Sequence, residues 1–351
     1  MDNSRTLLHI CAKYIEKYEI DLRGLTVLTE VASGAYFWNP FLAMMAGAEN
    51  VLLHCRDSRY GKASDIFRSF EEASSTTRLS NFLICERLDA DAISEADIVT
   101  NSGHVRPLDD SFVAAMKQDA VICLMWEPWE LRENEIDLDA AREKGILVLG
   151  TNEHEPPCDM RSYVEWLALK LIMEMRAPAL LDRFLVIGEQ DTLAAAVEAG
   201  LARMGLSVQR IACDISLETL TPALKETTCI IVAEHQFKRE IIGSCGVISP
   251  EMLSDKVHSV GVIAGQVDKN ALEERGVNVF PKEIAPVGFM SYQPSELGPY
   301  PVMDLFAAGL KVGQVAANAR KQGLSVSEAA KVALRDAPAL DLEGEYAWIK
   351  N

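Results

Sequence analysis

Short apolar runs alternate with helical patterns along almost the whole chain, and this alternation constrains the fold more than any other feature. Six runs that read as strands occupy residues 25–30, 50–55, 81–85, 96–101, 120–126 and 146–151. Helical patterns such as WNPFLAMMAGA and DDSFVAAMKQ lie between most of them. Continuously apolar strands separated by helices are typical of a parallel sheet that is covered on both faces. The first half of the chain therefore predicts a doubly wound α/β domain.

A second series of the same kind follows one long helical pattern at residues 159–175. FLVIG, SVQRIAC, TCIIVAE, HSVGVIAG and VNVFP read as its strands, and LETLTPALKE and DKNALEERG as helices between them. The tail at residues 299–323 reads as a helix rich in small residues, which ends at Gly323. The sequence thus predicts an α/β protein with two doubly wound parallel-sheet domains, Rossmann- or flavodoxin-like, and a cleft between them.

The predicted domains have the following bounds. An N-terminal α/β domain, expected to bind substrate and carry catalysis, covers residues 1–158, and an interdomain helix covers residues 159–178. A Rossmann-like domain of the nucleotide-binding type covers residues 179–290. Residues 291–351 form a junction loop and C-terminal helices that pack back on the first domain. The chain of 351 residues is long enough to give two domains ample cores.

Charge and cysteine usage narrow the class of protein. The formal net charge of −18 provides no general basic surface for nucleic acid or an anionic membrane, so we expect a small-molecule partner and neither of those two. The eight cysteines are scattered without a CxxC pair, and several lie in apolar runs where a reduced thiol packs as a small hydrophobe. The N-terminus lacks a signal-peptide profile, and no apolar run is long enough to span a membrane. A cytoplasmic protein is expected.

The stretch FLVIGEQDTLAAAVEAGLARMGLSVQRIACD at residues 184–214 has the outline of a dinucleotide-binding unit: strand, glycine, small-residue helix, second strand, acid. EIDLDAAREKGILVLGTNE, GVIAGQVDKNALEERG and VNVFPKE follow the order of segments in a known family. Over roughly residues 95–285 the chain resembles the D-2-hydroxyacid dehydrogenases, which include formate and glycerate dehydrogenases. The resemblance implies a nicotinamide cofactor, NAD or NADP, and a homodimer. It places the cofactor at Gly188, Gln190, Thr192, Asp214 and Gln266.

The chain departs from this family at the residues that carry chemistry. A Gly-x-Gly-x-x-Gly turn normally lets backbone amides approach the pyrophosphate at a helix N-terminus. Here Glu189 and Asp191 would repel a pyrophosphate, so the turn is damaged or repurposed. The substrate-binding arginine of the family is replaced near Gly265 and Gln266, and the position of its acid–base histidine holds Lys282. The resemblance therefore implies the fold but not the family's mechanism.

The strand ends of the first domain carry many functional side chains. In an open parallel sheet the carboxyl ends of the strands share one edge, which is where ligands bind. We therefore expect a site here, although exposed loops are also ordinarily polar. The residues predicted to bind substrate are Glu30, Ser33, Arg59, Asn101, Trp129, Asn152 and the junction-loop residue Tyr292. A second possibility is a nucleotide in the first domain, with ASGAYF at its phosphates and Asp57 at its ribose.

Three residues are predicted to be catalytic. His104 follows a glycine beside Arg106, so the pair is suited to acid–base work next to an anion clamp; the alternative is a surface histidine in a polar turn. Glu127 directly follows an apolar strand, and with Glu130 it is a candidate carboxylate pair with shifted pKa values. The alternative for Glu130 is an ion pair with Arg132. No metal site is predicted, because His154 has no second matched set of ligands.

These observations favour an oxidoreductase-like enzyme that uses a nicotinamide cofactor on a small polar or anionic metabolite at an interdomain cleft. A non-redox enzyme on the same scaffold, such as a lyase, isomerase or transferase, is the alternative that the damaged glycine turn favours. A nucleotide- or metabolite-binding protein without turnover is a third class. The small residues of the tail helix permit tight packing, either within the chain or at a dimer interface.

Overall fold

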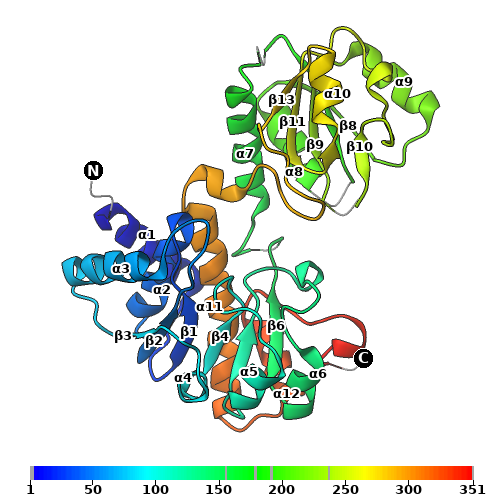
Figure 1. Ribbon diagram of the computed structural model, residues 1–351. Coiled ribbons are helices and arrows are strands. Elements are labelled where there is room, and N and C mark those ends of the chain that lie inside the picture. Colours follow the sequence, from blue (N-terminus) through cyan, green and yellow to red (C-terminus); the bar gives the residue numbers. More distant parts are fainter. Residues whose placement is uncertain (1–3, 155, 178–179, 190–192, 236–237, 350–351) are drawn as a thin grey trace. The chain divides into compact units, whose positions relative to one another are not determined.

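The computed structural model describes residues 4–154, 156–177, 180–189, 193–235 and 238–349 (Figure 1). The chain divides into two compact units. Unit 1 comprises residues 1–159 and 299–351, and unit 2 comprises residues 160–298. No helix in the described ranges is both long and apolar enough to cross a bilayer.

Unit 1 is built on a sheet of seven strands in the order β14-β6-β5-β4-β1-β2-β3. Six of them are parallel: β1 (Thr26–Glu30), β2 (Asn50–His54), β3 (Phe82–Cys85), β4 (Ile98–Thr100), β5 (Val121–Cys123) and β6 (Leu147–Thr151). Every residue of β1, β4, β5 and β6 is buried, as the continuous apolar runs predict. The six parallel strands have the 3-2-1-4-5-6 order of a doubly wound sheet, with the winding reversed between β1 and β4.

Helices cover both faces of this sheet. On one face, α4 (Ala90–Glu95), α5 (Asp110–Ala115) and α6 (Leu138–Lys144) pack on residues such as Leu28, Val99 and Ile122. Asp89, Asp109 and Asp137 cap their N-termini by accepting backbone N–H groups. α1 (Ser4–Tyr18) and α2 (Asn39–Met45) lie together with the C-terminal helix α11 (Tyr300–Lys321), which packs on β4, β5 and β6 (Figure 1). α3 (Ala63–Thr77) and the short turn η1 (Gly34–Trp38) complete this part.

The C-terminal segment belongs to unit 1. Gly309 and Gly313 of α11 face the sheet so closely that an added Cβ would lie 2.4 Å from Met125 Cε and 2.7 Å from Ile98 Cγ2, respectively. The small residues of the tail helix are thus used within the chain. After α12 (Val326–Asp336), β14 (Ala339–Leu340) adds to β6 as an antiparallel edge strand, which the sequence pattern does not indicate.

Unit 2 has a five-stranded parallel sheet in the order β13-β11-β9-β7-β8. Its strands are β7 (Arg183–Ile187), β8 (Ser207–Ile211), β9 (Cys229–Ala233), β11 (Ser259–Ala264) and β13 (Asn278–Phe280). α7 (Arg161–Glu174) and α8 (Leu193–Arg203) cover one face; α9 (Leu217–Glu226) and α10 (Lys269–Glu274) cover the other. β10 (Glu240–Ile242) and β12 (Gln266–Val267) form a separate small sheet. The winding reverses between β7 and β9.

The predicted fold class is confirmed, because both sheets are parallel and doubly wound with helices on both faces. The units differ from the predicted domain bounds in two places. The long helix α7 belongs to unit 2, where Val164, Leu167 and Leu171 enter the same core as β7 and β9. The junction loop up to Gly298 also belongs to unit 2, since Tyr292 is part of that core.

Candidate functional site

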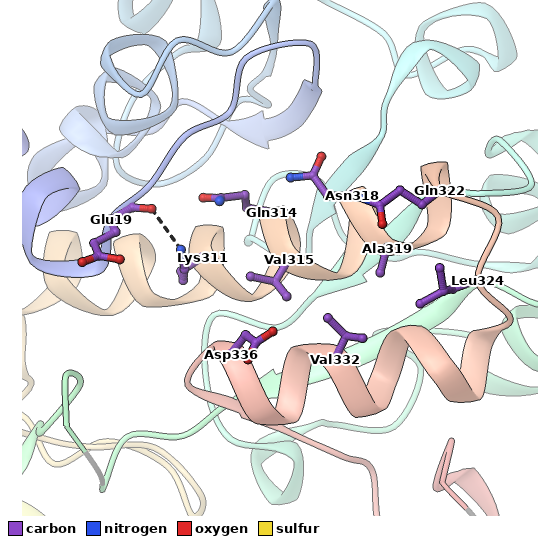
Figure 2. Close-up of a pocket in the computed structure, with 10 residues that line it drawn as sticks. All are labelled: Glu19, Lys311, Gln314, Val315, Asn318, Ala319, Gln322, Leu324, Val332 and Asp336. Atoms are coloured by element: carbon purple, nitrogen blue, oxygen red, sulfur yellow. Dashed lines mark hydrogen bonds between the residues drawn. The ribbon is translucent and has the colours of Figure 1, made fainter.

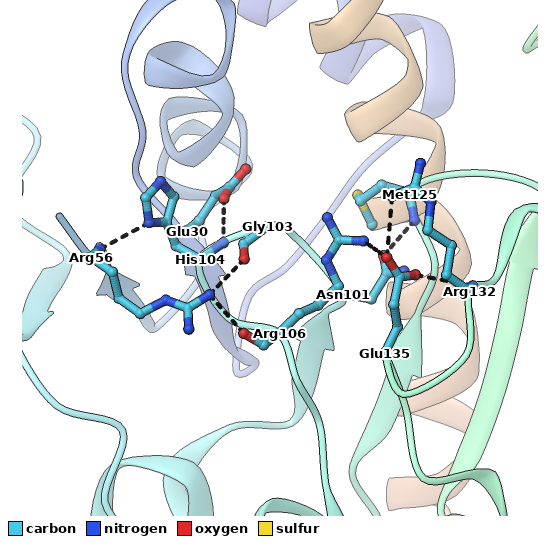
Figure 3. Close-up of polar contacts among 9 residues, drawn as sticks. All are labelled: Glu30, Arg56, Asn101, Gly103, His104, Arg106, Met125, Arg132 and Glu135. Atoms are coloured by element: carbon cyan, nitrogen blue, oxygen red, sulfur yellow. Dashed lines mark hydrogen bonds and ion pairs between the residues drawn. The ribbon is translucent and has the colours of Figure 1, made fainter. Parts of the chain in front are cut away.

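The candidate site lies in unit 1, at the topological switch point between β1 and β4. Here the strand order of the doubly wound sheet reverses direction. Ligands of open α/β sheets bind outside the carboxyl ends of the strands at this point. The loop after β1 brings Glu30 to it, and the loop after β4 brings the segment Ser102–Arg106. Arg56 comes from the end of β2, and Glu135 from the segment after β5 (Figure 3). We call Glu30, Arg56, His104, Arg106 and Glu135 the rim cluster.

Glu30 is the buried acid of the rim cluster. Its residue surface is 4% exposed, and its Oε2 accepts the backbone N–H of His104 at 2.8 Å. Its own N–H donates to Ser102 Oγ at 3.2 Å. Burial raises the pKa of the Glu30 carboxyl, opposed in part by the His104 N–H and by the charge of Arg106. Glu30 therefore retains a proton more readily than an ordinary glutamate.

His104 is held in one orientation by the end of β2. Its Nδ1 accepts the backbone N–H of Arg56 at 2.9 Å. When one ring nitrogen of a neutral imidazole is an acceptor, the other carries the hydrogen, so Nε2 is a donor. Burial, with a smaller contribution from the charge of Arg56, lowers the pKa of His104. The imidazole is thus suited to donate a hydrogen bond, and poorly suited to accept a proton.

Arg106 is the cation whose charge lowers the pKa of Glu30 most. Its guanidinium forms an ion pair with Glu135, and its Cζ lies 4.9 Å from the centre of the Trp126 ring. Arg56 donates to the carbonyl oxygens of Gly103 and Arg106 at 3.0 and 2.8 Å, which fixes the loop between them (Figure 3). An added Cβ on Gly103 would lie 3.4 Å from Glu30 Oε2 and 3.5 Å from Arg106 Nη2. Gly103 therefore lies against both charged groups without a side chain to separate them.

A second group of acids lies at the ends of β5 and β6. Glu127 is 6% exposed, and its carboxylate accepts Trp129 Nε1 at 2.7 Å and the Glu153 backbone N–H at 3.3 Å. His154 Nε2 lies 3.4 Å from the same carboxylate. Burial and then the negative charge of Glu127 raise the pKa of Glu130 to about 7. Burial and then the charges of Glu130 and Glu127 raise the pKa of Glu153. Three glutamates thus share a region where they do not all ionise freely.

Replacing Glu130 by Gln is expected to change how stability depends on pH. A carboxyl whose folded pKa is raised binds more protons in the folded state, so its contribution to stability falls as the pH rises between about 4.3 and 7. Glu130→Gln should flatten this fall and stabilise the chain by about 1–2 kcal/mol at pH 8. Urea denaturation at several pH values measures the effect. The exposed Glu86→Gln serves as control, and parallel curves for all three proteins would contradict the expectation.

The structure places the other predicted residues of unit 1 in different roles. Asn101 is fully buried, and its Oδ1 accepts the Met125 N–H at 3.0 Å, which ties β4 to the segment after β5. Arg59 stacks on the exposed Tyr60 ring with a separation of 4.7 Å. Ser33 precedes η1 without a side-chain capping bond, and the Asn152 N–H donates to Pro338 O at 2.8 Å. Of the three predicted catalytic residues, His104 and Arg106 belong to the rim cluster, and Glu127 belongs to the second group of acids.

Among the predicted residues of unit 2, Tyr292 and Gln266 make hydrogen bonds within the unit. Tyr292 is 2% exposed, and its hydroxyl donates to Glu174 at 2.7 Å and accepts from Lys170 at 2.9 Å. The Gln266 amide donates to Ala285 O at 2.7 Å. Asp214 follows β8, as the acid that binds a ribose does in dinucleotide sites. Gln190 and Thr192, predicted to contact the cofactor, lie outside the described residues.

The turn after β7 fits a pyrophosphate poorly. Gly188 is required for packing, because an added Cβ would lie 2.5 Å from the Ala233 carbonyl oxygen and 2.7 Å from Ala194 Cβ. The next residue is Glu189, and its backbone N–H donates to the carboxylate of Glu234 at 2.8 Å. Glu234 is fully buried. A carboxylate therefore accepts an amide of the turn that would otherwise face the phosphates, and the acids at this rim would repel them.

Several contributing residues are absent from the sequence prediction. Arg56 and Glu135 orient His104 and Arg106, and Glu234 occupies the reversal point of unit 2. Arg56 and Glu234 directly follow apolar strands, so their positions at strand ends were a usable signal. Glu135 had no such signal, because its pairing with Arg106 depends on how the loop after β5 folds back.

The described residues also line two hollows in unit 1. One, of about 400 Å³, lies along α11 and α12, where Lys311 donates to the Glu19 carbonyl oxygen at 2.9 Å (Figure 2). The other, of about 450 Å³, includes Lys17, Asn152 and Arg335. Neither includes a member of the rim cluster, and Asn152 alone belongs to the predicted site residues.

The structure defines a two-unit α/β protein in which each unit is built on a doubly wound sheet. No protein-family model matches the chain, and no curated protein matches it significantly. Among solved structures, a dipicolinate synthase chain from Bacillus subtilis is similar, with 12% identity, a TM-score of 0.52, and coverage of 84% of this chain and 96% of that one. This likeness shows the fold.

Two further solved structures have lower scores. A dipicolinate synthase chain from Bacillus halodurans has 9% identity and a TM-score of 0.49, with coverage of 83% of this chain and 98% of that one. A D-isomer specific 2-hydroxyacid dehydrogenase from Lactobacillus delbrueckii, in its NAD-complexed form, has 10% identity and a TM-score of 0.47, with coverage of 85% and 98%.

Proposed function

We propose that this chain is an enzyme that acts on a small anionic metabolite at the rim cluster of unit 1. The observation that carries the proposal is a buried acid that accepts the His104 backbone N–H and lies, like the Arg106 guanidinium, against Gly103. The His104 imidazole next to this glycine is held by the Arg56 N–H. A structural role alone accounts poorly for this set, because burying Glu30 costs free energy that an apolar residue would avoid. Perturbed groups at a strand-end rim are typical of functional sites.

Each residue has a distinct part in the proposed chemistry. Arg106 has five N–H donors, and its pairing with Glu135 leaves donors for a carboxylate or phosphate of the metabolite. His104 donates through Nε2 to an oxygen on which negative charge develops. Glu30 holds the proton that is transferred, since its pKa is raised.

The oxidoreductase fold makes reduction or oxidation with NAD or NADP the first candidate chemistry. Of the residues in unit 2, Asp214 suits a ribose, whereas Glu189 and Glu234 do not suit a pyrophosphate. A proton-transfer reaction without redox, as in a lyase or isomerase, is the second candidate, and these two acids favour it. Both candidates use the same rim cluster.

One assay separates the two candidates. The purified chain is mixed with oxaloacetate, pyruvate or glyoxylate, with and without NADH or NADPH, and both the cofactor absorbance and the acids are followed. Reduction should consume cofactor, and non-redox conversion should consume the acid alone. In either case Glu30→Gln should lower the rate by at least about 100-fold, whereas the exposed Glu86→Gln should not. The proposal fails if no acid is converted under any condition, or if Glu30→Gln retains full activity.

A homodimer and a cytoplasmic location are part of the proposal as well. α7 exposes Trp166 and Met173, which lie two turns apart along the helix. Such residues suit an interface with a second copy of the chain. Light scattering of the full chain, compared with Trp166→Glu, measures the oligomeric state.

A further inference from the structure

Three side chains converge at the reversal of winding in unit 2. Glu189 follows β7, Cys213 follows β8, and Glu234 follows β9, so each comes from the carboxyl end of a different neighbouring strand. One ligand atom of each, a carboxylate oxygen or Sγ, lies within 4.8 Å of the other two. We call these residues the Glu–Cys–Glu cluster.

The burial of this cluster distinguishes it from ordinary surface acids. Glu234 is fully buried, Cys213 is 1% exposed, and Glu189 is half-buried. The Cys213 thiol makes no hydrogen bond within the described part of the chain, and it takes part in no disulfide there. A buried thiol is thus directed at two carboxylates.

The backbone holds the cluster in place. Glu234 Oε2 accepts the Glu189 N–H at 2.8 Å, and Glu189 Oε1 accepts the Cys213 N–H at 3.3 Å. These bonds orient the carboxylates without excluding a further ligand, because each carboxylate has about four acceptor positions. Asp214, next to Cys213 in the sequence, is a further acid at this rim.

We propose that the Glu–Cys–Glu cluster binds a divalent transition-metal ion of the Zn²⁺ class. A thiolate with two carboxylates supplies three protein ligands, which is the number in zinc sites that keep a position for water or substrate. The thiolate favours Zn²⁺ over Mg²⁺ or Ca²⁺, which prefer oxygen alone. Ligand atoms around tetrahedral zinc lie about 3.5 Å apart, so atoms that lie within 4.8 Å of one another need to move together by at most about 1.3 Å.

This inference goes beyond the proposed function, since it concerns unit 2 and does not depend on the rim cluster. A cation bound by Glu189 and Glu234 would add positive charge at the rim where these two acids lie.

Metal binding is tested on the full-length chain after treatment with a chelator and dialysis. Co²⁺ should bind with about one ion per chain and give the near-ultraviolet charge-transfer absorption of a thiolate ligand. Zn²⁺, measured by competition with a chromophoric chelator, should displace it. Cys213→Ser should abolish the absorption and weaken Zn²⁺ binding at least about 100-fold, and Glu234→Gln should weaken it at least about 10-fold.

Cys245→Ser is the matched control, because Cys245 is exposed and lies outside the cluster. It should leave both the absorption and the affinity unchanged. Gln at position 234 still accepts the Glu189 N–H, so this variant keeps the test valid if Cys213→Ser does not fold, as judged by circular dichroism. Absence of thiolate absorption in the wild type overturns the proposal, as does wild-type affinity in folded Glu234→Gln.

Discussion

Replacing Arg106 by Gln is expected to weaken the binding of small anionic ligands strongly and to destabilise unit 1. Glu135 would lose one of its arginine partners, and the buried Glu30 would lose the positive charge that lowers its pKa most. Breaking a buried ion pair from one side costs about 3–5 kcal/mol, and we expect about 2–3 kcal/mol here because Arg132 also contacts Glu135 at 3.3 Å. Loss of the charge-assisted bonds should weaken carboxylate binding about 100-fold. Urea denaturation and thermal shift with oxaloacetate measure the two effects.

Arg132→Gln is the matched control for this prediction. Arg132 contacts the same carboxylate but is exposed, so its removal should cost less than about 1 kcal/mol and leave ligand binding unchanged. Both variants could lose stability and ligand binding to the same extent. The effect would then come from the ion pair with Glu135, and not from the position of Arg106 beside Glu30. The anion-binding role of Arg106 would then be wrong.

Replacing Gly313 by Val is expected to destabilise unit 1 by about 3 kcal/mol. Gly313 lies in the middle of α11, where an added Cβ would lie 2.7 Å from Ile98 Cγ2 and 3.1 Å from Cys123 Sγ. A β-branched side chain would force the helix away from β4 and β5, and overpacking of this kind costs about 1–3 kcal/mol or more. Urea denaturation should show the loss as an earlier first transition.

The exposed Lys331 of α12 provides the comparison. Lys331→Val carries the helix-propensity cost of a β-branched residue without burial, and should lower stability by no more than about 0.5 kcal/mol. If Gly313→Val is tolerated equally well, α11 does not pack tightly on this sheet, and residues 299–351 would not belong to unit 1.

The sequence predicts the sheets well because apolar runs bounded by helical patterns are local signals. β1, β2 and β6 lie within one residue of their predicted bounds, since their residues are all or nearly all buried. β14 is missed because a two-residue edge strand has no periodicity of its own. The sequence also does not predict that α7 belongs to unit 2. Leu167 and Leu171 would be apolar in either case, and only the folded structure shows that they pack in the core of unit 2.

The candidate site is predictable in outline but not in detail. His104 and Arg106 were found because strand-end loops of a parallel sheet share one edge. The donor role of His104 depends on the hydrogen bond from the Arg56 N–H to its Nδ1. Arg56 lies in another loop, so the residues around His104 in the sequence do not predict this contact. Tyr292 was expected at a ligand, yet its hydroxyl is shared between Lys170 and Glu174 inside unit 2. Glu189 of the turn after β7 was visible in the sequence, but its convergence with Cys213 and Glu234 was not.

Hydrogen exchange of the full chain with and without saturating oxaloacetate reports which loops a small anion covers, and so shows whether the rim cluster binds it. We expect slower exchange of backbone amides in the loops after β1 and β4, residues 30–36 and 101–106, and loss of this protection in Arg106→Gln. Protection confined to the ends of β7 and β9, or no protection anywhere in the chain, would contradict it.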